Sequence, residues 1–291
     1  MAKTIRKAAV AGQFYDANPV NLKNYINELK ATTKLSSKSH NEAKPRAVIL
    51  PHAGYIYSGA TAVKTLQHAI GHNYQRIVIL APSHRIRFNG ISLGNYSEFA
   101  TPLGNVEVDT DAVDKLAALN SPLLTTNNQP HEQEHALEVE LPLLQELIPA
   151  IKIIPAIVGF TDQSTVKQLA TLLLPLWEPE TLWVISSDFT HYGRAFQYLP
   201  FTDNIAENLS ILDLEAAELI TKLDLDGFEK YLERTGATIC GAAPIKILLA
   251  IINQAQTNGE KITGELIDYT TSAAQSGDYS HCVSYVGISF T

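Results

Sequence analysis

Short, continuous runs of apolar residues recur along the chain, and stretches with helical spacing separate them. The runs are rich in Val, Ile and Leu, and they cover Ala47–Leu50, Ile77–Leu80, Ile151–Val158 and Leu182–Ile185. Such runs are typical of parallel strands that are buried on both faces. Between the first two runs, apolar side chains near helical spacing predict a helix over 59–70. Ala47 and Ile77 are therefore about one strand–helix–strand unit apart.

Helical and strand patterns continue to the end of the chain. Stripes of apolar residues predict helices over 137–148, 212–223 and 245–252, the last with Pro244 at its first turn. The alternation over Cys282–Phe290 predicts a strand, and the polar stretch Ala31–Lys44 predicts a mobile surface loop. We therefore expect an α/β fold with a central mixed, largely parallel sheet flanked by helices, in a single domain over residues 1–291.

Composition narrows the class of protein. Hydrophobic residues make up 45% and charged residues 18%, which is typical of a globular chain. The net charge of -8 argues against a nucleic-acid or anionic-membrane binder, since both need a basic face. No apolar run reaches the roughly 18 residues that would span a bilayer. The two cysteines exclude a disulfide framework and suit a reducing compartment, so we expect a cytoplasmic protein.

Histidines follow three of the predicted strands directly. His52 comes after the first run, His84 after the second, and Asp188 and His191 after the fourth. Because the carboxyl ends of parallel strands meet at one edge of a sheet, we expect these side chains to converge there. Imidazole and carboxylate are ligands for transition metals, and a neutral histidine is also a general base near pH 7. The alternative is a set of unrelated surface or capping histidines.

Cys240 lies directly before a predicted helix. Unpaired N–H groups and partial positive charge at a helix start stabilise a thiolate, which binds metals and attacks electrophiles. The alternative is a small buried hydrophobic residue, the common fate of a free cysteine.

The segment His131–His135 matches the H-E-x-x-H pattern of zinc proteases. Its polar context and the preceding Pro130 speak against that interpretation. His135 and Glu138 remain as a pair on one helix face that could reach the crevice, or as an exposed helix start. Phe14 belongs to an aromatic segment that could cover the crevice, and Tyr55 follows His52 closely. Aromatic side chains at these positions either bind a planar substrate or simply pack.

Several longer motifs together resemble the Memo family, whose bacterial and archaeal members are called AmmeMemoRadiSam system protein B. The matching segments are Ala11–Tyr15, Pro51–Tyr55, Ala81–His84, Thr101–Gly104, Glu134–Glu138, Ser186–Gly193 and Thr238–Gly241. The resemblance implies a fold similar to that of class III extradiol dioxygenases, which hold Fe(II) with two histidines and a carboxylate.

By this resemblance, His52 and His84 stand at the two histidine ligand positions and Cys240 takes the place of the carboxylate. His191 stands at the acid/base position with Asp188 nearby. From the residues themselves we expect His135 to lie near this centre as well, and Tyr55, Glu138 and Phe14 to line the substrate site. A thiolate ligand implies iron(II) or copper, with zinc as a further possibility. The implied function is a metal-binding redox protein or oxidoreductase.

Two other functions stay open. The same crevice could bind a peptide or protein in a non-catalytic adaptor, or its metal could activate water in a hydrolase. The expected ligand is a small molecule or a peptide, and the family label implies a functional link to radical-SAM and AMMECR-type proteins.

Overall fold

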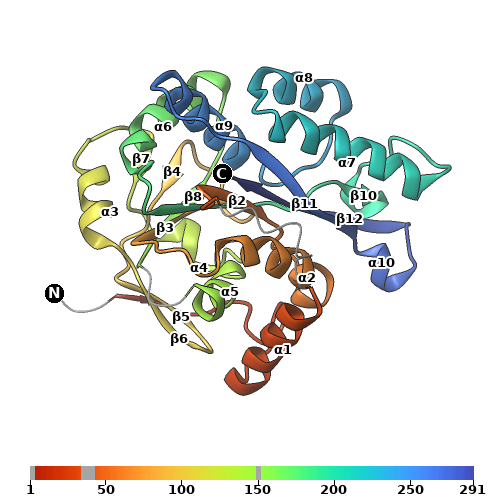
Figure 1. Cartoon of the computed structure of the whole chain (residues 1–291), viewed down its shortest axis with the longest axis horizontal. Helices are drawn as coiled ribbons and strands as arrows, with labels where there is room; N and C mark the ends of the chain where they lie inside the picture. The colour runs from red at the N-terminus through yellow and green to blue at the C-terminus, as the bar shows by residue number, and fades with distance from the viewer. Residues whose placement is uncertain (1–3, 34–42, 149–151) are drawn as a thin grey trace.

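A mixed β-sheet runs through the middle of the molecule, and helices lie on both of its sides (Figure 1). This computed structural model describes residues 4–33, 43–148 and 152–291. The four central strands are parallel, as the apolar runs predict. In spatial order they are β2 (Ala47–Leu50), β9 (Thr181–Ser186), β3 (Arg76–Pro82) and β8 (Lys152–Val158).

Antiparallel strands extend this parallel centre on both sides. Strand β12 (His281–Phe290) pairs with β2, and β10 (His191–Gly193) and β11 (Gly264–Thr271) pair with β12. On the other side β4 (Ile91–Ser92) is antiparallel to β8 and carries β7 (Leu124–Thr125). A smaller sheet contains β1 (Ile5–Arg6), β5 (Glu98–Thr101) and β6 (Gly104–Glu107). The predicted mixed sheet is confirmed, and its parallel character is confined mainly to the centre.

The predicted helices are present with shifted ends. The helix expected over 59–70 is α2 (Tyr55–Leu66), followed by the 3₁₀ turn η1 (Gln67–Ala69). The stripe over 137–148 becomes α5 (Glu140–Leu147), with Leu137 in the preceding turns. The stripe over 212–223 is the end of a longer helix, and the one over 245–252 is the middle of another. The remaining helices and 3₁₀ turns are α1 (Pro19–Thr32), α3 (Thr110–Ala117), α4 (Gln129–Glu132), α6 (Gln163–Leu173), η2 (Leu174–Leu176), η3 (Arg194–Phe196), α7 (Ile205–Thr221), α8 (Leu225–Thr235), α9 (Ala242–Thr257) and α10 (Ala273–Ser276).

The loop predicted over Ala31–Lys44 falls mostly outside the described residues. Ala31 and Thr32 are still part of α1, and residues 34–42 are not described. Ile151 of the third apolar run also lies outside them. No helix in the described ranges is long and apolar enough to cross a membrane.

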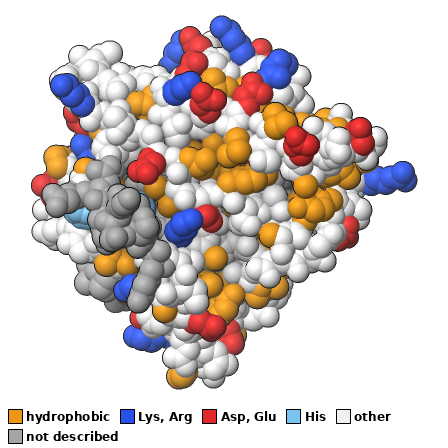
Figure 2. Space-filling model, turned by 45° about the vertical axis from the view of Figure 1, so that its right-hand side comes forward, with side chains coloured by type: hydrophobic (Ala, Val, Ile, Leu, Met, Phe, Trp, Pro, Cys, Tyr) orange, Lys and Arg blue, Asp and Glu red, His pale blue; other side chains and the backbone are white. Residues whose placement is uncertain are grey.

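The surface seen in Figure 2 is mixed in character. Apolar side chains form several separate groups there, and acidic and basic side chains are interspersed rather than gathered into one basic area. The candidate site residues lie just after the carboxyl ends of the central strands. His52 follows β2, His84 follows β3, and Asp188 and His191 follow β9. The parallel centre of the sheet therefore brings these four residues to one edge.

Candidate metal centre

Three histidines form a compact group at the carboxyl edge of the sheet. One nitrogen each of His52, His84 and His135 lies within 4.8 Å of the other two. The ring centroids are 5.3 Å apart for His52 and His84, 5.4 Å for His52 and His135, and 4.7 Å for His84 and His135. Two of the rings follow strands, and the third belongs to the turns between α4 and α5. Three imidazoles at this spacing could hold a transition-metal ion.

Glu134 orients two of these rings. Its Oε1 lies 2.8 Å from Nδ1 of His84 and 3.2 Å from Nδ1 of His135, and its other oxygen accepts the backbone N–H of His84. Burial alone would raise the pKa of Glu134, but the bonds from His135 and His84 outweigh burial and hold this pKa well below its usual range. An anionic Glu134 therefore accepts the Nδ1 proton of His84 and favours a proton on Nδ1 of His135, which leaves both Nε2 lone pairs for a metal.

His52 is oriented by a hydroxyl group instead. Its Nδ1 lies 2.7 Å from Oγ of Ser186, and its backbone N–H donates to Oδ1 of Asp188 at 2.8 Å. The side chain is 2% exposed, and burial, helped by the neighbouring His84 and His135, lowers the pKa of His52 well below its ordinary value. The ring is therefore neutral at physiological pH. With the proton on Nδ1, its Nε2 faces the cluster.

Cys240 lies beside His52 rather than among the three nitrogens. Its Sγ is 3.2 Å from Nε2 of His52, and the backbone N–H of Asp188 donates to the sulfur at 3.2 Å. Burial and the nearby Asp188 raise the pKa of the Cys240 thiol well above its ordinary value. We expected Cys240 to complete the set with His52 and His84. Among the described residues His135 is the third member of the group of nitrogens, and Cys240 contacts His52, so its role as a ligand stays a prediction.

Gly241 allows the close approach of Cys240 to the sheet. A Cβ atom on this residue would lie 2.3 Å from Cβ of Ser187, which is closer than two carbon atoms can pack. Its backbone N–H donates to Oγ of Ser187 at 3.0 Å. The glycine therefore lets the start of α9 sit directly against the end of β9.

Asp188 and His191 lie next to the cluster and have different hydrogen-bond partners. Burial raises the pKa of Asp188 to about 7, and its Oδ2 is 3.9 Å from Nε2 of His52. The proton on Nδ1 of His191 faces two carbonyl oxygens, 2.9 Å away on Phe189 and 3.1 Å away on Thr238. Burial lowers the pKa of His191. Main-chain carbonyls thus orient the His191 ring, whereas Asp188 accepts the backbone N–H of His52.

The three residues expected to face a substrate have different surroundings. Phe14 lies against the cluster, with its ring centroid 4.8 Å from that of His135. Glu138 is fully buried and binds Arg6, the backbone N–H groups of Ala9 and Val10, and the Tyr15 hydroxyl. The Tyr55 hydroxyl donates to the carbonyl of Val139 at 2.7 Å. The carboxylate of Glu138 and the hydroxyl of Tyr55 thus have partners within the fold, and a role for these residues in substrate binding stays a prediction.

The H-E-x-x-H pattern does not form a two-histidine face. Helix α4 ends at Glu132, so His131 and His135 are not one turn apart on a continuous helix. Nε2 of His131 lies 3.0 Å from the carbonyl oxygen of Ser92, to which it donates, and the residue is 1% exposed. Only His135 of this motif belongs to the cluster.

Two residues that organise the centre escaped the sequence reasoning as partners of the ligands. In the sequence, Glu134 stands only inside the segment Glu134–Glu138 and Ser186 only inside the segment Ser186–Gly193. The sequence offers one indication of their role, which is that each lies close to a candidate site residue. Glu134 directly precedes His135, and Ser186 ends the strand that leads to Asp188. Neither position stands out by residue type.

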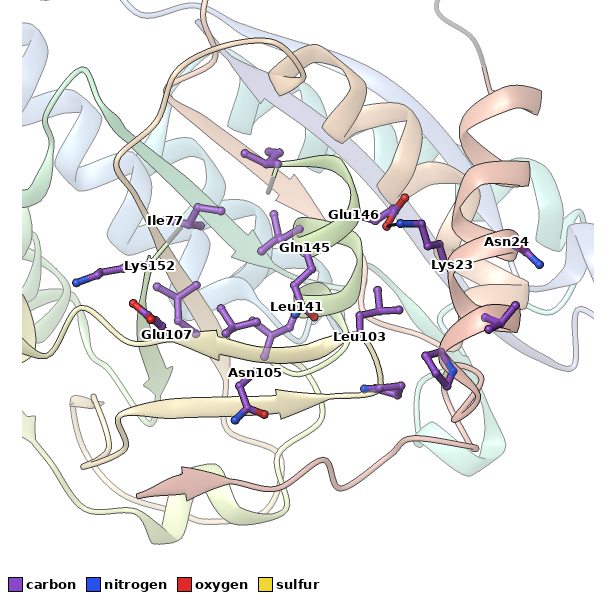
Figure 3. A pocket seen from close by; sticks show the side chains of 17 residues that line it. Lys23, Asn24, Ile77, Leu103, Asn105, Glu107, Leu141, Gln145, Glu146 and Lys152 are labelled. Carbon is purple, nitrogen blue, oxygen red and sulfur yellow. Dashed lines mark ion pairs between the residues drawn. The ribbon is translucent and has the colours of Figure 1, made fainter. Parts of the chain in front are cut away.

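Two cavities are large enough to admit a small substrate. One of about 570 Å³ opens beside the cluster and is lined by Ser83, Arg87, Phe160 and Cys240 among others. Another of about 770 Å³ lies near the amino ends of β3 and β8, between α1, α5 and the β5–β6 hairpin (Figure 3). In Figure 3 its apolar floor includes Leu103 and Leu141, and Lys23 reaches Glu146 at its rim. Of these two cavities, the first is lined by Cys240, which contacts His52.

The chain is similar to known proteins over nearly its whole length. The sequence profile described as Memo-like protein matches residues 6–289. A MEMO1 family protein of Thermoplasma volcanium is 32% identical over 285 residues, which cover 98% of this chain and 97% of that protein. The protein memo-1 homolog of Caenorhabditis elegans is 31% identical over 288 residues, 96% of this chain and 81% of its own. Human protein MEMO1 is 29% identical over 298 residues, 98% of this chain and 97% of its own.

Proposed function

Because this chain belongs to the Memo family, we propose that it binds iron(II) or copper at the cluster of His52, His84 and His135 and functions as a redox protein or oxidoreductase. The observation that carries this proposal is the grouping of three imidazole nitrogens within 4.8 Å. Each of these rings has its other nitrogen next to a fixed acceptor, Glu134 or Ser186, and such partners accompany metal-binding histidines.

The donor set fits a transition metal better than Mg²⁺ or Ca²⁺. Neutral imidazoles suit zinc, copper and iron, whereas Mg²⁺ and Ca²⁺ prefer oxygen ligands. Cys240 is a fourth donor within reach, since its sulfur already contacts His52. The thiol donates to the lone pair of His52 in the metal-free protein, and a metal ion at this position would displace that proton. A soft thiolate beside imidazoles favours copper or iron.

The surrounding residues have separate roles in this proposal. When bound, the metal supplies one-electron chemistry and Lewis acidity. His191 is neutral, and its Nε2 has no hydrogen bond to any residue in the described ranges, so it can accept a proton from a bound substrate. Phe14 covers one side of the cluster and excludes water from it. The cavity of about 570 Å³ beside Cys240 receives the substrate, which is a small molecule or a peptide segment.

Metal analysis of single-residue variants tests this proposal. We expect protein purified without chelator, or loaded anaerobically with iron(II) or copper, to bind close to one ion per chain. His52→Ala, His84→Ala and His135→Ala should each lose most of it, since each variant lacks one of the three imidazoles that hold the ion. The control is His72→Ala, which lies outside the cluster and should keep its metal. Equal metal content in all four variants would contradict the proposal.

A comparison of Cys240→Ser with wild type decides whether Cys240 is a further ligand. If Cys240 binds the ion, the loaded protein shows a thiolate-to-metal absorption band that Cys240→Ser abolishes. If it does not, the band is absent and Cys240→Ser keeps its metal. Zinc in place of iron or copper would favour a hydrolase. A protein that binds no metal but retains peptides in the cavity would favour an adaptor.

A further inference from the structure

Another buried carboxyl group, Glu140, lies behind the histidine cluster. It is the first residue of α5, it is fully buried, and its Oε1 lies 2.9 Å from Oγ of Ser186. The same Oγ is 2.7 Å from Nδ1 of His52 and 2.7 Å from the carbonyl oxygen of Ala136. Ser186 thus connects Glu140 to a proposed metal ligand.

The number of protons available decides the charge of Glu140. A serine hydroxyl donates one hydrogen bond and accepts up to two. The carbonyl of Ala136 can only accept, so it takes the Ser186 proton. The proton on Nδ1 of His52 then fills one lone pair of Oγ. The remaining contact, between Oγ and Glu140, is a hydrogen bond only if Glu140 supplies the proton.

The surroundings of Glu140 agree with this count. No Lys, Arg or His in the described ranges forms an ion pair with it, and its Oε2 has no hydrogen-bond partner there. An ionised carboxylate without a cation or a donor in a fully buried position is strongly disfavoured. Burial raises the pKa of Glu140 well above its ordinary value, and the nearby Asp188 adds to this rise. The contact with Ser186 lowers this pKa but does not outweigh burial.

We propose that Glu140 is a neutral carboxylic acid that positions His52 by donating to Ser186. This inference rests on the proposed metal site. The hydrogen bond from Glu140 directs the Ser186 hydroxyl toward Ala136 and keeps Oγ as the acceptor for Nδ1–H of His52, so Nε2 stays free for the metal. His84 and His135 share the anionic Glu134, whereas His52 has only a hydroxyl behind it. His52 is therefore the weakest electron donor of the three rings.

Conservative and disruptive variants separate charge from position. In Glu140→Gln the amide N–H can donate to Ser186 as the acid does, so metal affinity should stay within about threefold of wild type. Glu140→Ala removes the donor and should weaken metal binding by roughly tenfold. This is the lower end of the loss that follows when a group that hydrogen-bonds to a metal ligand is removed. The matched control is Glu146→Gln on the same helix, whose partner is Lys23 at 3.3 Å. This control should not change metal affinity.

Infrared difference spectra of the metal-free protein test the proton directly. At about pH 8, above the pKa of about 7 of Asp188, wild type minus Glu140→Gln should show a protonated-carboxyl C=O band. Wild type minus Glu146→Gln should show only carboxylate bands. A carboxylate band for Glu140, or a tenfold loss of metal affinity in Glu140→Gln, would overturn the inference. Failure of wild type to bind metal would instead count against the proposed function, because the infrared result does not depend on metal.

Discussion

At the scale of single residues, Glu134 connects more of the proposed centre than any one ligand does, because one carboxylate holds two imidazoles. We expect Glu134→Gln to weaken metal binding by roughly 10- to 100-fold, since a carboxamide offers one acceptor oxygen in place of two. Metal titration of the purified variant measures the loss. Glu132→Gln, two residues earlier and exposed, should bind as wild type does. Equal affinities in the two variants would mean that Glu134 does not orient the rings.

His191 has a different expected role, because its Nδ1 donates to carbonyl oxygens and its Nε2 has no hydrogen bond within the part of the chain that the structure describes. We expect His191→Ala to keep its metal while losing turnover or oxygen uptake, if the centre activates oxygen. Parallel measurement of metal content and oxygen consumption distinguishes the two roles. Loss of metal would make His191 a ligand, and unchanged consumption would remove it from the chemistry.

His131 provides a pH-dependent stability. Burial lowers its pKa to about 4 from the ordinary 6.5. Below pH 6.5 the unfolded chain binds a proton on this histidine, whereas in the folded chain the ring stays neutral. The free energy of unfolding therefore falls as pH drops from 6.5 toward 4. The difference corresponds to about 3 kcal/mol. In His131→Gln, denaturant unfolding between pH 7 and pH 4 should show a weaker acid sensitivity by about that amount, whereas the exposed control His281→Gln should behave as wild type.

The sequence predicted individual ligands unevenly. His52 and His84 could be found because each directly follows an apolar run, and a parallel sheet brings such positions together. His135 was a weaker candidate because it belongs to turns that no periodic pattern describes. The inward positions of Glu138 and Tyr55 could not be predicted from the sequence, since their hydrogen-bond partners lie far away along the chain, about 130 residues from Glu138 and about 80 from Tyr55.

At the scale of elements, the N-terminal segment holds the turns that carry Glu134 and His135. Arg6 on β1 forms an ion pair with Glu138, and it donates to the carbonyls of His131 at 3.0 Å and Glu134 at 2.6 Å. The side chains of Arg6 and Glu138 are 2% and 0% exposed. These contacts fix the backbone on both sides of the metal-binding turn.

We expect Arg6→Met to lower the free energy of unfolding by about 3–5 kcal/mol, because it leaves Glu138 buried without its cation. Denaturant unfolding measures this change. Lys222→Met removes the exposed partner of Glu218 and should alter stability by less than about 0.5 kcal/mol. If both variants were equally stable, the buried pair would not hold the segment. Metal affinity should fall only in Arg6→Met.

Element prediction succeeded where a pattern was long enough. The apolar runs predicted β2, β3, β8 and β9, and alternation predicted β12. Two-residue strands such as β1 and β4 have no periodic signal, because they exist only through pairing with distant chain. The end of α2 is similar: its pattern continues to Ile70, but the backbone tightens into a 3₁₀ turn after Leu66.

At the scale of the whole molecule, metal binding and folding should be coupled. An ion that binds the native state alone stabilises it by about 2.7 kcal/mol at a free concentration of 100 times the dissociation constant. Thermal unfolding with and without iron(II) or copper should therefore show a higher midpoint for loaded wild type. His84→Ala should show no such shift. An equal shift in both proteins would indicate binding elsewhere on the chain.

The distance along the chain between the residues of the centre determines when it can form during refolding. His52 contacts Asp188 across 136 residues and Cys240 across 188, so the centre is incomplete until the central strands have come together. Closing such long loops makes these contacts late ones. Metal should therefore leave the refolding rate almost unchanged and act by slowing unfolding, the behaviour of interactions that are absent from the transition state. In stopped-flow experiments only the unfolding arm of the chevron should move when metal is added, and the folded apoprotein, rather than the nascent chain, would be the species that acquires the ion.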